Sequence, residues 1–327
     1  MNKKSIIAFG IVICLIVIIS TLALTVGGST IGLKEAVNFL KDSSDISKTS
    51  KIIIFEIRIP RIVGGIIVGA TLAVSGTLIK AVMKNPLADT GLLGIQSGAS
   101  LSAMIVILIV PKFMPILPIF AFAGGIFAYI ILSILAYKNG IQPLRLVLAG
   151  VAVNALFGSF IGIISIYNAD KVQNALTWLN GSLASITVDD MKLLLIYGTV
   201  ALIIAMFTIP KCNLLALDDM TIINLGENLT LIRIIIASIS VLLSAISVSI
   251  VGVIGFVGLI IPHIARMIVG SNHKTMLPFS MLLGSLFVLM ADTIQVYTFS
   301  PIEMPVGIVI SMVGAPFFLF LLRKQKI

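Results

Sequence analysis

The chain has 327 residues, a formal net charge of +9, 59% hydrophobic residues and only 11% charged residues. An average soluble domain is ~45–50% apolar and ~25% charged, so a soluble protein of this size could not cover its surface with so few charges. These values and a mean hydropathy of +1.19 predict a polytopic membrane protein. They exclude a cytosolic enzyme, a nucleic-acid-binding domain and a disulfide-stapled secreted domain.

Apolar segments follow one another along the whole chain, most of them close to the ~20 residues that cross the hydrocarbon core of a bilayer. The ten predicted spans lie at 5–27, 60–82, 92–110, 116–137, 145–167, 191–209, 233–253, 256–268, 278–298 and 305–322. The first is interpreted as a retained helix rather than a secretory signal. The eighth is short, and we expect it to tilt or to start from a broken segment at Gly252–Gly258. The prediction is an all-α integral membrane protein that forms a single transmembrane domain over 1–327.

The distribution of Lys and Arg predicts the orientation. With both termini inside, 13 of the 22 basic residues lie at cytoplasmic ends and 9 lie outside, which favours the N-in, C-in arrangement. The run Arg323–Lys326 is the clearest inside anchor. Two long outer loops, 28–59 and 168–190, are expected, the first with a short amphipathic helix at Gly32–Asp42. The only long inner connection is 210–233.

Small and charged residues within the spans indicate how the helices pack. Gly65 and Gly69 are four residues apart, as are Gly158 and Gly162, and this spacing favours close helix packing. Asp292 is the best candidate for an intramembrane carboxylate, and it needs a partner or a cavity. A functional role and a structural hydrogen bond both stay open for it. Transporters driven by protons or sodium usually have several such groups, so a single one weakens that interpretation.

No catalytic or metal site is predicted in this chain. His263 and His273 are the only histidines, and Cys14 and Cys212 are isolated and lack metal-ligand spacing. The sequence contains no H-E-x-x-H, G-x-S-x-G or G-x-x-x-x-G-K-[ST] motif. We therefore expect no cofactor here and no ATP bound through a P-loop.

The inner connection 210–233 contains a short predicted helix with an apolar surface. Asp218 is placed to cap its start and Gly226 to close its end. Two interpretations stay open: the helix lies against the membrane interface or its own bundle, or it enters a groove on a cytoplasmic partner. The residues of this candidate docking element are Leu217, Asp218, Asp219, Met220, Ile223, Leu225 and Gly226.

An ordered set of motifs runs from about 58 to 322. They are Arg58–Arg61, Gly69–Gly76, Lys84–Asp89, Leu92–Ile95, Gly98-Ala99, Leu148–Val151, Trp178–Ser182, Leu214–Leu217, Leu225-Gly226, Gly255–Arg266, Ala291-Asp292, Glu303–Gly307 and Gly314–Phe318. Together they resemble the permease subunits of ABC importers for iron–siderophores, haem and cobalamin, the FecCD-type or vitamin B12-permease-like family.

The resemblance implies a type II ABC importer permease with ten transmembrane helices in the bacterial plasma membrane. It implies a second permease copy around a central pathway, as a homodimer or as a heterodimer with a related permease. Two cytoplasmic ABC ATPase subunits would bind ATP and Mg²⁺, and an extracellular or periplasmic substrate-binding protein would deliver the cargo. The connection 210–233 would carry the coupling helix.

The resemblance also implies roles at the outer face. Arg58 and Arg61 would face glutamates of the binding protein, and Glu303, in a motif of the same region, is the third residue expected to dock with it. Anchoring of a helix end at the membrane interface stays open as the alternative role of the two arginines. Gln295 stands where family members often have arginine, and Lys80 replaces a common glutamine.

The pathway is expected to be lined by small, weakly polar side chains, and Asn154, Ser159 and Ser165 are the candidates. Siderophore, haem and cobalamin all stay open as cargo. The alternatives to the importer are an ion-coupled secondary transporter and a membrane enzyme or channel.

Overall fold

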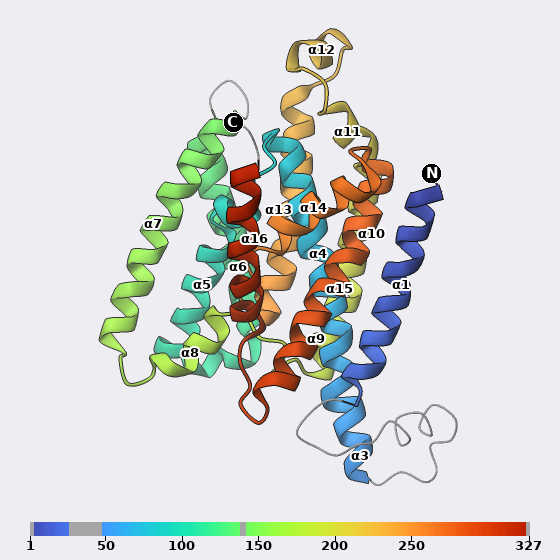
Figure 1. Ribbon diagram of the computed structural model, residues 1–327. Helices are drawn as coiled ribbons and strands as arrows, with labels where there is room; N and C mark the ends of the chain where they lie inside the picture. Colours follow the sequence, from blue (N-terminus) through green and yellow to red (C-terminus); the bar gives the residue numbers. More distant parts are fainter. Residues whose placement is uncertain (1–2, 26–47, 138–141, 325–327) are drawn as a thin grey trace.

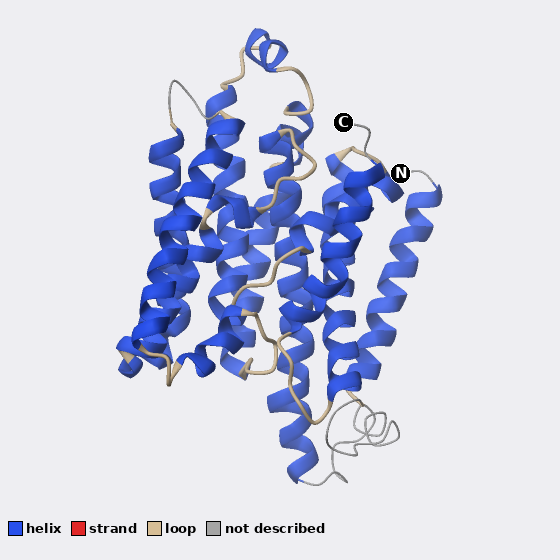
Figure 2. Cartoon of the chain, turned by 60° about the vertical axis from the view of Figure 1, so that its left-hand side comes forward, coloured by secondary structure: helices blue, strands red, loops and turns tan. Residues whose placement is uncertain are grey.

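The computed structural model describes residues 3–25, 48–137 and 142–324. The described residues form helices joined by turns and loops, with no strand among them (Figure 1, Figure 2). Seven helical segments are long and apolar enough to cross a membrane, and three shorter apolar helices, Ile95–Ile109, Val257–Val269 and Val306–Phe320, accompany them. These segments correspond to the ten predicted spans. The amphipathic helix predicted at 32–42 lies outside the described residues.

Five of the helical elements are not α-helical: η1, η3 and η5 are π-helical, and η2 and η4 are 3-10 helices. In chain order the elements are α1 (Lys3–Ala23), α3 (Lys48–Ile52), η1 (Ile53–Arg58), α4 (Ile59–Met83), η2 (Thr90–Leu93), α5 (Ile95–Met104), η3 (Ile105–Ile109), η4 (Pro111–Ile116), α6 (Leu117–Ala136), α7 (Pro143–Tyr167), α8 (Val172–Leu179), α9 (Val188–Leu193), η5 (Leu194–Gly198), α10 (Thr199–Phe207), α11 (Ile209–Leu214), α12 (Asp219–Asn224), α13 (Leu229–Val251), α14 (Val257–Val269), α15 (His273–Phe299) and α16 (Val306–Lys324).

The second span is longer than predicted. The loop expected over 28–59 is wrong for its last part, because one helical segment of 35 residues runs over Thr49–Met83. No glycine or proline lies within residues 48–59, directly before Pro60. A proline inside a helix lacks an N–H and clashes with the preceding turn, and the π-helical turn η1 directly before it relieves this conflict. At 1.5 Å per residue the segment is about 52 Å long, so its outer end extends beyond the hydrocarbon core.

Helix α4 is the centre of the bundle, and glycines let its neighbours touch its backbone. A Cβ added to Gly69 would lie 2.2 Å from the carbonyl oxygen of Gly284 in α15, and one added to Gly76 would lie 2.1 Å from that of Gly258 in α14. Small residues at helix contacts permit this approach. Helix α4 is therefore held against two helices by direct backbone contact.

The predicted close packing is confirmed for one glycine pair and wrong for the other within this chain. Gly69 contacts α15 as described, and a Cβ on Gly65 would lie 3.3 Å from the Leu183 side chain. A Cβ on Gly158 or Gly162 in α7 would meet no atom within 4 Å. The spacing alone does not distinguish a packed helix face from an open one.

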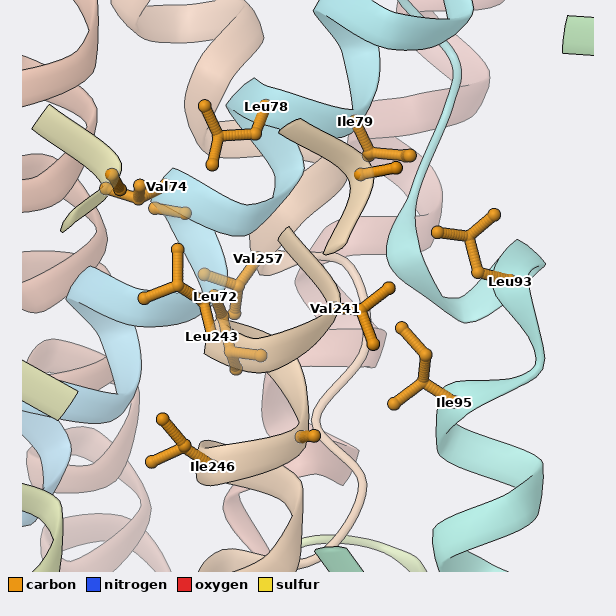
Figure 3. Packing of buried hydrophobic residues seen from close by; sticks show 14 of the residues in the cluster. Leu72, Val74, Leu78, Ile79, Leu93, Ile95, Val241, Leu243, Ile246 and Val257 are labelled. Carbon is orange, nitrogen blue, oxygen red and sulfur yellow. The ribbon is translucent and has the colours of Figure 1, made fainter. Parts of the chain in front are cut away.

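Apolar and hydroxyl side chains fill the contact between α4 and α13. Figure 3 shows Leu72 of α4 beside Leu243 of α13. Between the same helices, the Thr71 and Ser247 hydroxyl oxygens are 2.5 Å apart. Such hydroxyl contacts add interhelical hydrogen bonds that an apolar solvent cannot supply.

The eighth span starts from a broken segment, as expected. Helix α13 ends at Val251, five residues without helical structure follow, and α14 begins at Val257. Gly252 has a positive φ of 76°, and a Cβ there would lie 1.9 Å from the Trp178 carbonyl oxygen. The Ser182 N–H donates to the Val251 carbonyl at 2.8 Å. A neighbouring segment of the protein thus supplies a hydrogen bond to a backbone group that the interrupted helix leaves without a helical partner.

The start of α1, the end of α16 and helix α12 all lie on one side of the molecule (Figure 1). This agrees with an even number of spans and with the N-in, C-in orientation. Helix α12 projects past the ends of the other helices on this side (Figure 1). The inner connection thus places a short helix beyond the ends of the spans, on the side that the distribution of Lys and Arg predicts to be cytoplasmic.

Candidate functional site

The cytoplasmic helix α12 is short and has a well-defined end. It covers Asp219–Asn224 and stops at Gly226, which has a positive φ of 80°. The Gly226 N–H donates to the Ile223 carbonyl at 2.9 Å, and the Glu227 N–H donates to the Ile222 carbonyl at 3.3 Å. These two bonds form a Schellman motif, for which glycine is the favoured residue. The predicted closing role of Gly226 is what the backbone shows.

The start of α12 differs in detail from the prediction. Asp218 occupies the N-cap position in an extended conformation, but its side chain makes no capping hydrogen bond. The carboxylate of its neighbour Asp219 forms ion pairs with Lys84 and Arg233 instead.

The apolar side chains over residues 217–225 are exposed, apart from one. Ile222 is fully buried against the bundle. The others form what we call the apolar docking surface: Leu217 (42% exposed), Met220 (68%), Ile223 (51%) and Leu225 (62%). Apolar side chains gathered at the tip of a projecting cytoplasmic helix are typical of a protein-binding surface.

Three charged residues from separate elements hold α12 in place, and we call them the coupling tether. Asp219 accepts hydrogen bonds from Lys84 Nζ at 2.7 Å and from Arg233 Nη2 at 2.9 Å. Lys84 caps the cytoplasmic end of α4 with φ 49° and also donates to the Leu217 carbonyl at 2.5 Å. Arg233 lies in the first turns of α13 and is 5% exposed. Helix α12 is thus fixed to the ends of two central helices.

The electrostatics of the tether favour the ionised carboxylate. Burial alone would raise the pKa of Asp219, but the hydrogen bonds and charges of Lys84 and Arg233 outweigh it and lower the pKa below its usual value. The sequence analysis counted Lys84 and Arg233 among the basic residues that set the orientation, and Lys84 also begins the motif Lys84–Asp89, but neither was expected to contact the short helix. One sequence signal could have pointed to their role: each of the two basic residues lies at the inner end of a span, on the same side as an inner connection that contains acidic residues.

Lys211 and Cys212 lie at the start of the connection. Lys211 donates to both carboxylate oxygens of Glu227 at 2.7 and 2.8 Å, which joins the two ends of the connection. Burial raises the pKa of the Cys212 thiol to about 11. This thiol stays protonated at neutral pH and is a poor nucleophile.

At the outer end of α4, Asp292 has a partner. Arg61 donates to its two carboxylate oxygens at 2.8 and 2.9 Å, and also to Gln295 Oε1 at 3.0 Å. Glu303 lies 3.5 Å from the same guanidinium. The side chains of Arg61 and Asp292 are 13% and 8% exposed. The intramembrane carboxylate is therefore part of a buried bidentate ion pair, the structural alternative of the sequence analysis.

Of the three outer residues predicted to meet a binding protein, only Glu303 has a largely exposed side chain, at 65%. Arg61 points at Asp292. Arg58 is 7% exposed, and its guanidinium donates to the carbonyl of Leu24 at the end of α1. All three border one outer cavity of about 320 Å³, so they share a region although the arginines point inward.

The three pathway candidates lie along α7 and do not form one site. Asn154 accepts from Ser97 Oγ at 2.7 Å and donates to the Gly91 carbonyl at 3.0 Å, so it joins α7 to η2 and α5. The hydroxyls of Ser159 and Ser165 donate to backbone carbonyls one turn earlier in α7. Among the described residues, no group of three His, Cys, Asp or Glu could hold a metal ion.

Comparison with known proteins gives consistent matches. The model of the FecCD transport family matches residues 14–324. The Fe(3+)-citrate import system permease protein YfmE of Bacillus subtilis is 36% identical over 325 residues, which cover 99% of this chain and 97% of the relative. The cobalamin import system permease protein BtuC of Halobacterium salinarum is 34% identical over 283 residues, covering 86% and 76%.

A solved structure described as an inward-facing conformation of a metal-chelate type ABC transporter superposes with a TM-score of 0.82 at 28% identity, covering 99% of this chain and all of the other. The sequence match and the structural match both extend over nearly the whole chain, including α12 and the broken segment before α14. This chain belongs to the FecCD transport family.

Proposed function

We propose that this chain is the permease subunit of an ATP-driven importer that moves a metal chelate, with iron as the favoured metal, into the bacterial cell. Family membership supports this, as do relatives named for Fe(3+)-citrate, iron(3+)-hydroxamate and cobalamin import. The observation that carries the proposal is the apolar docking surface on a helix that projects into the cytoplasm. No P-loop is present in the sequence, so ATP hydrolysis belongs to a partner ATPase that binds this surface.

The coupling tether gives this partner a mechanical connection to the bundle. Movement of α12 acts on α4 through Lys84 and on α13 through Arg233. Helix α4 touches α14 and α15 backbone to backbone, and such tight contacts move as one body rather than deform. A push on α12 would therefore rock a group of central helices, as alternating access requires.

On the outer side, we propose that a substrate-binding protein docks on the rim formed by Arg58, Arg61 and Glu303. Glu303 has the most exposed side chain of the three and would contact that partner first. Charges on such a rim mainly affect encounter rate and register. A second permease copy would complete the pathway.

The ion-coupled alternative has no support. Proton or sodium coupling needs a carboxylate that is free to bind the ion within the membrane. Asp292 is held by two hydrogen bonds from Arg61, so the carboxylate that raised this alternative is already neutralised.

The test replaces exposed apolar residues of the docking surface with charged ones. Met220→Asp and Leu217→Arg should abolish co-purification of the ATPase while leaving the permease inserted in the membrane, because a desolvated charge at such a contact is costly. Thr221→Asp is the matched control, since it adds the same charge at an exposed polar position of α12. Normal co-purification of both apolar-surface variants would refute the proposal.

A further inference from the structure

A cavity of about 260 Å³ lies on the cytoplasmic side, among α4, α11, α14 and α15. Its lining includes five lysine, arginine or histidine side chains and no Asp or Glu. These five are Lys80, Lys84, His263, Arg266 and His273. We call it the basic cavity. It is distinct from the apolar docking surface, although Ala216 on its rim directly precedes Leu217 of that surface.

The positive charge of the basic cavity is only partly balanced. Lys84 is paired with Asp219 of the tether. Lys80 donates to the Leu259 carbonyl at 2.5 Å and is attracted by Asp89, which does not line the cavity. The remaining strong cation, Arg266, donates to a serine hydroxyl at 2.9 Å, and no carboxylate in the described part of the chain forms a salt bridge with it.

Like charges that converge in a recess raise the local potential and attract an anion. The volume would hold several water molecules at ~30 Å³ each, enough space for one carboxylate side chain. The rim residues Lys84, Ala216 and Arg266 are exposed, so the recess is reachable from the cytoplasm.

We propose that the basic cavity receives an acidic side chain of the cytoplasmic ATPase subunit when that subunit docks on α12. The inference rests on the proposed function, because it needs this partner. It is favoured over a free ion because the cavity continues the apolar docking surface and shares Lys84 with the coupling tether. A carboxylate entering the cavity competes with Asp219 for Lys84, so docking would act directly on the tether.

The test measures binding of the purified ATPase to the full-length permease in nanodiscs at low and at high salt. Arg266→Gln should weaken binding by roughly tenfold at low salt and by much less at high salt, where charge attraction is screened. Lys80→Gln should act in the same direction. Arg266→Lys, which keeps the charge, should bind within about threefold of the unchanged protein. Lys274→Gln is the control, since Lys274 is an exposed cation on the same side but outside the cavity.

Equal binding by Arg266→Gln and the unchanged protein would overturn the proposal. So would native mass spectrometry that finds phosphate or an anionic lipid on the unchanged permease but not on Arg266→Gln, with ATPase binding unaffected. Met220→Asp, measured in parallel, separates the two levels of the argument. If the unchanged permease does not bind the ATPase, the proposed function fails. If the unchanged permease binds the ATPase and Met220→Asp does not, normal ATPase binding by Arg266→Gln overturns only the basic-cavity proposal.

Discussion

Replacing Asp219 with asparagine should release α12 from the bundle without removing the apolar docking surface. The side chain of Asp219 is 44% exposed, but the side chain of its partner Arg233 is only 7% exposed. An exposed ion pair contributes about 0–1 kcal/mol, and breaking a buried pair costs about 3–5 kcal/mol. A half-exposed carboxylate on a buried guanidinium lies between these limits, at about 1–2 kcal/mol, which is a factor of about 5–30 in the equilibrium between held and released α12.

Hydrogen exchange of the α12 amides measures this equilibrium directly. The amides of Gly226 and Glu227 are bonded within the Schellman motif, and in Asp219→Asn they should exchange about 5–30 times faster. Asp218→Asn is the matched control: this neighbouring carboxylate makes no capping bond, so its loss should change the stability of α12 by less than about 0.5 kcal/mol. Equal exchange in the two variants would refute the tether. With the ATPase bound, Asp219→Asn should hydrolyse ATP but transport poorly.

Three further predictions follow from other contacts. Gly69→Ala should destabilise the permease by about 1–3 kcal/mol in thermal unfolding, because its Cβ would overlap a backbone carbonyl, whereas Gly10→Ala, with open space around it, should be neutral. Asp292→Asn should cost up to about 3–5 kcal/mol, because Arg61 loses its bidentate carboxylate partner and keeps only Gln295 at 3.0 Å and Glu303 at 3.5 Å. Combining it with Arg61→Gln should recover part of the loss, and additive effects would contradict a direct pair. The pKa of Asp219 is lowered in the fold. Its ion pairs therefore stabilise the held position of α12 at pH values above the ordinary carboxylate pKa of about 4, and this stabilisation is lost as the pH falls below that value. The exchange rates of the α12 amides, corrected for intrinsic rates, should stay constant from neutral pH to about 5, and a loss of protection near pH 6 would contradict this prediction.

The apolar spans could be predicted because hydrophobic length is a local property. The broken segment before α14 was predictable from its glycines, of which Gly252 adopts a positive φ. The helical extension over 48–59 was missed because its lysines, serine and glutamate resemble a loop. Local composition does not show that a π-helical turn allows the helix to continue into Pro60.

The site was predictable only where neighbouring residues define it. The apolar docking surface and its closing Gly226 lie within one short segment, so the sequence contained the whole pattern. The Arg61–Asp292 pair joins residues 231 positions apart, and Lys84 and Asp219 are 135 apart. No periodicity connects such positions, and only the packing of α4 against its neighbours brings them together.

The central claim is that this chain transports only when a cytoplasmic ATPase drives it. The most direct measurement is the accumulation of a labelled ferric chelate in proteoliposomes, in the presence and absence of the ATPase subunit. The binding protein is supplied at the outer face of the permease and ATP at its cytoplasmic face. The account predicts uptake against a gradient only with the ATPase, and loss of that uptake in Met220→Asp. Accumulation by the permease alone, driven by a proton or sodium gradient, would contradict it.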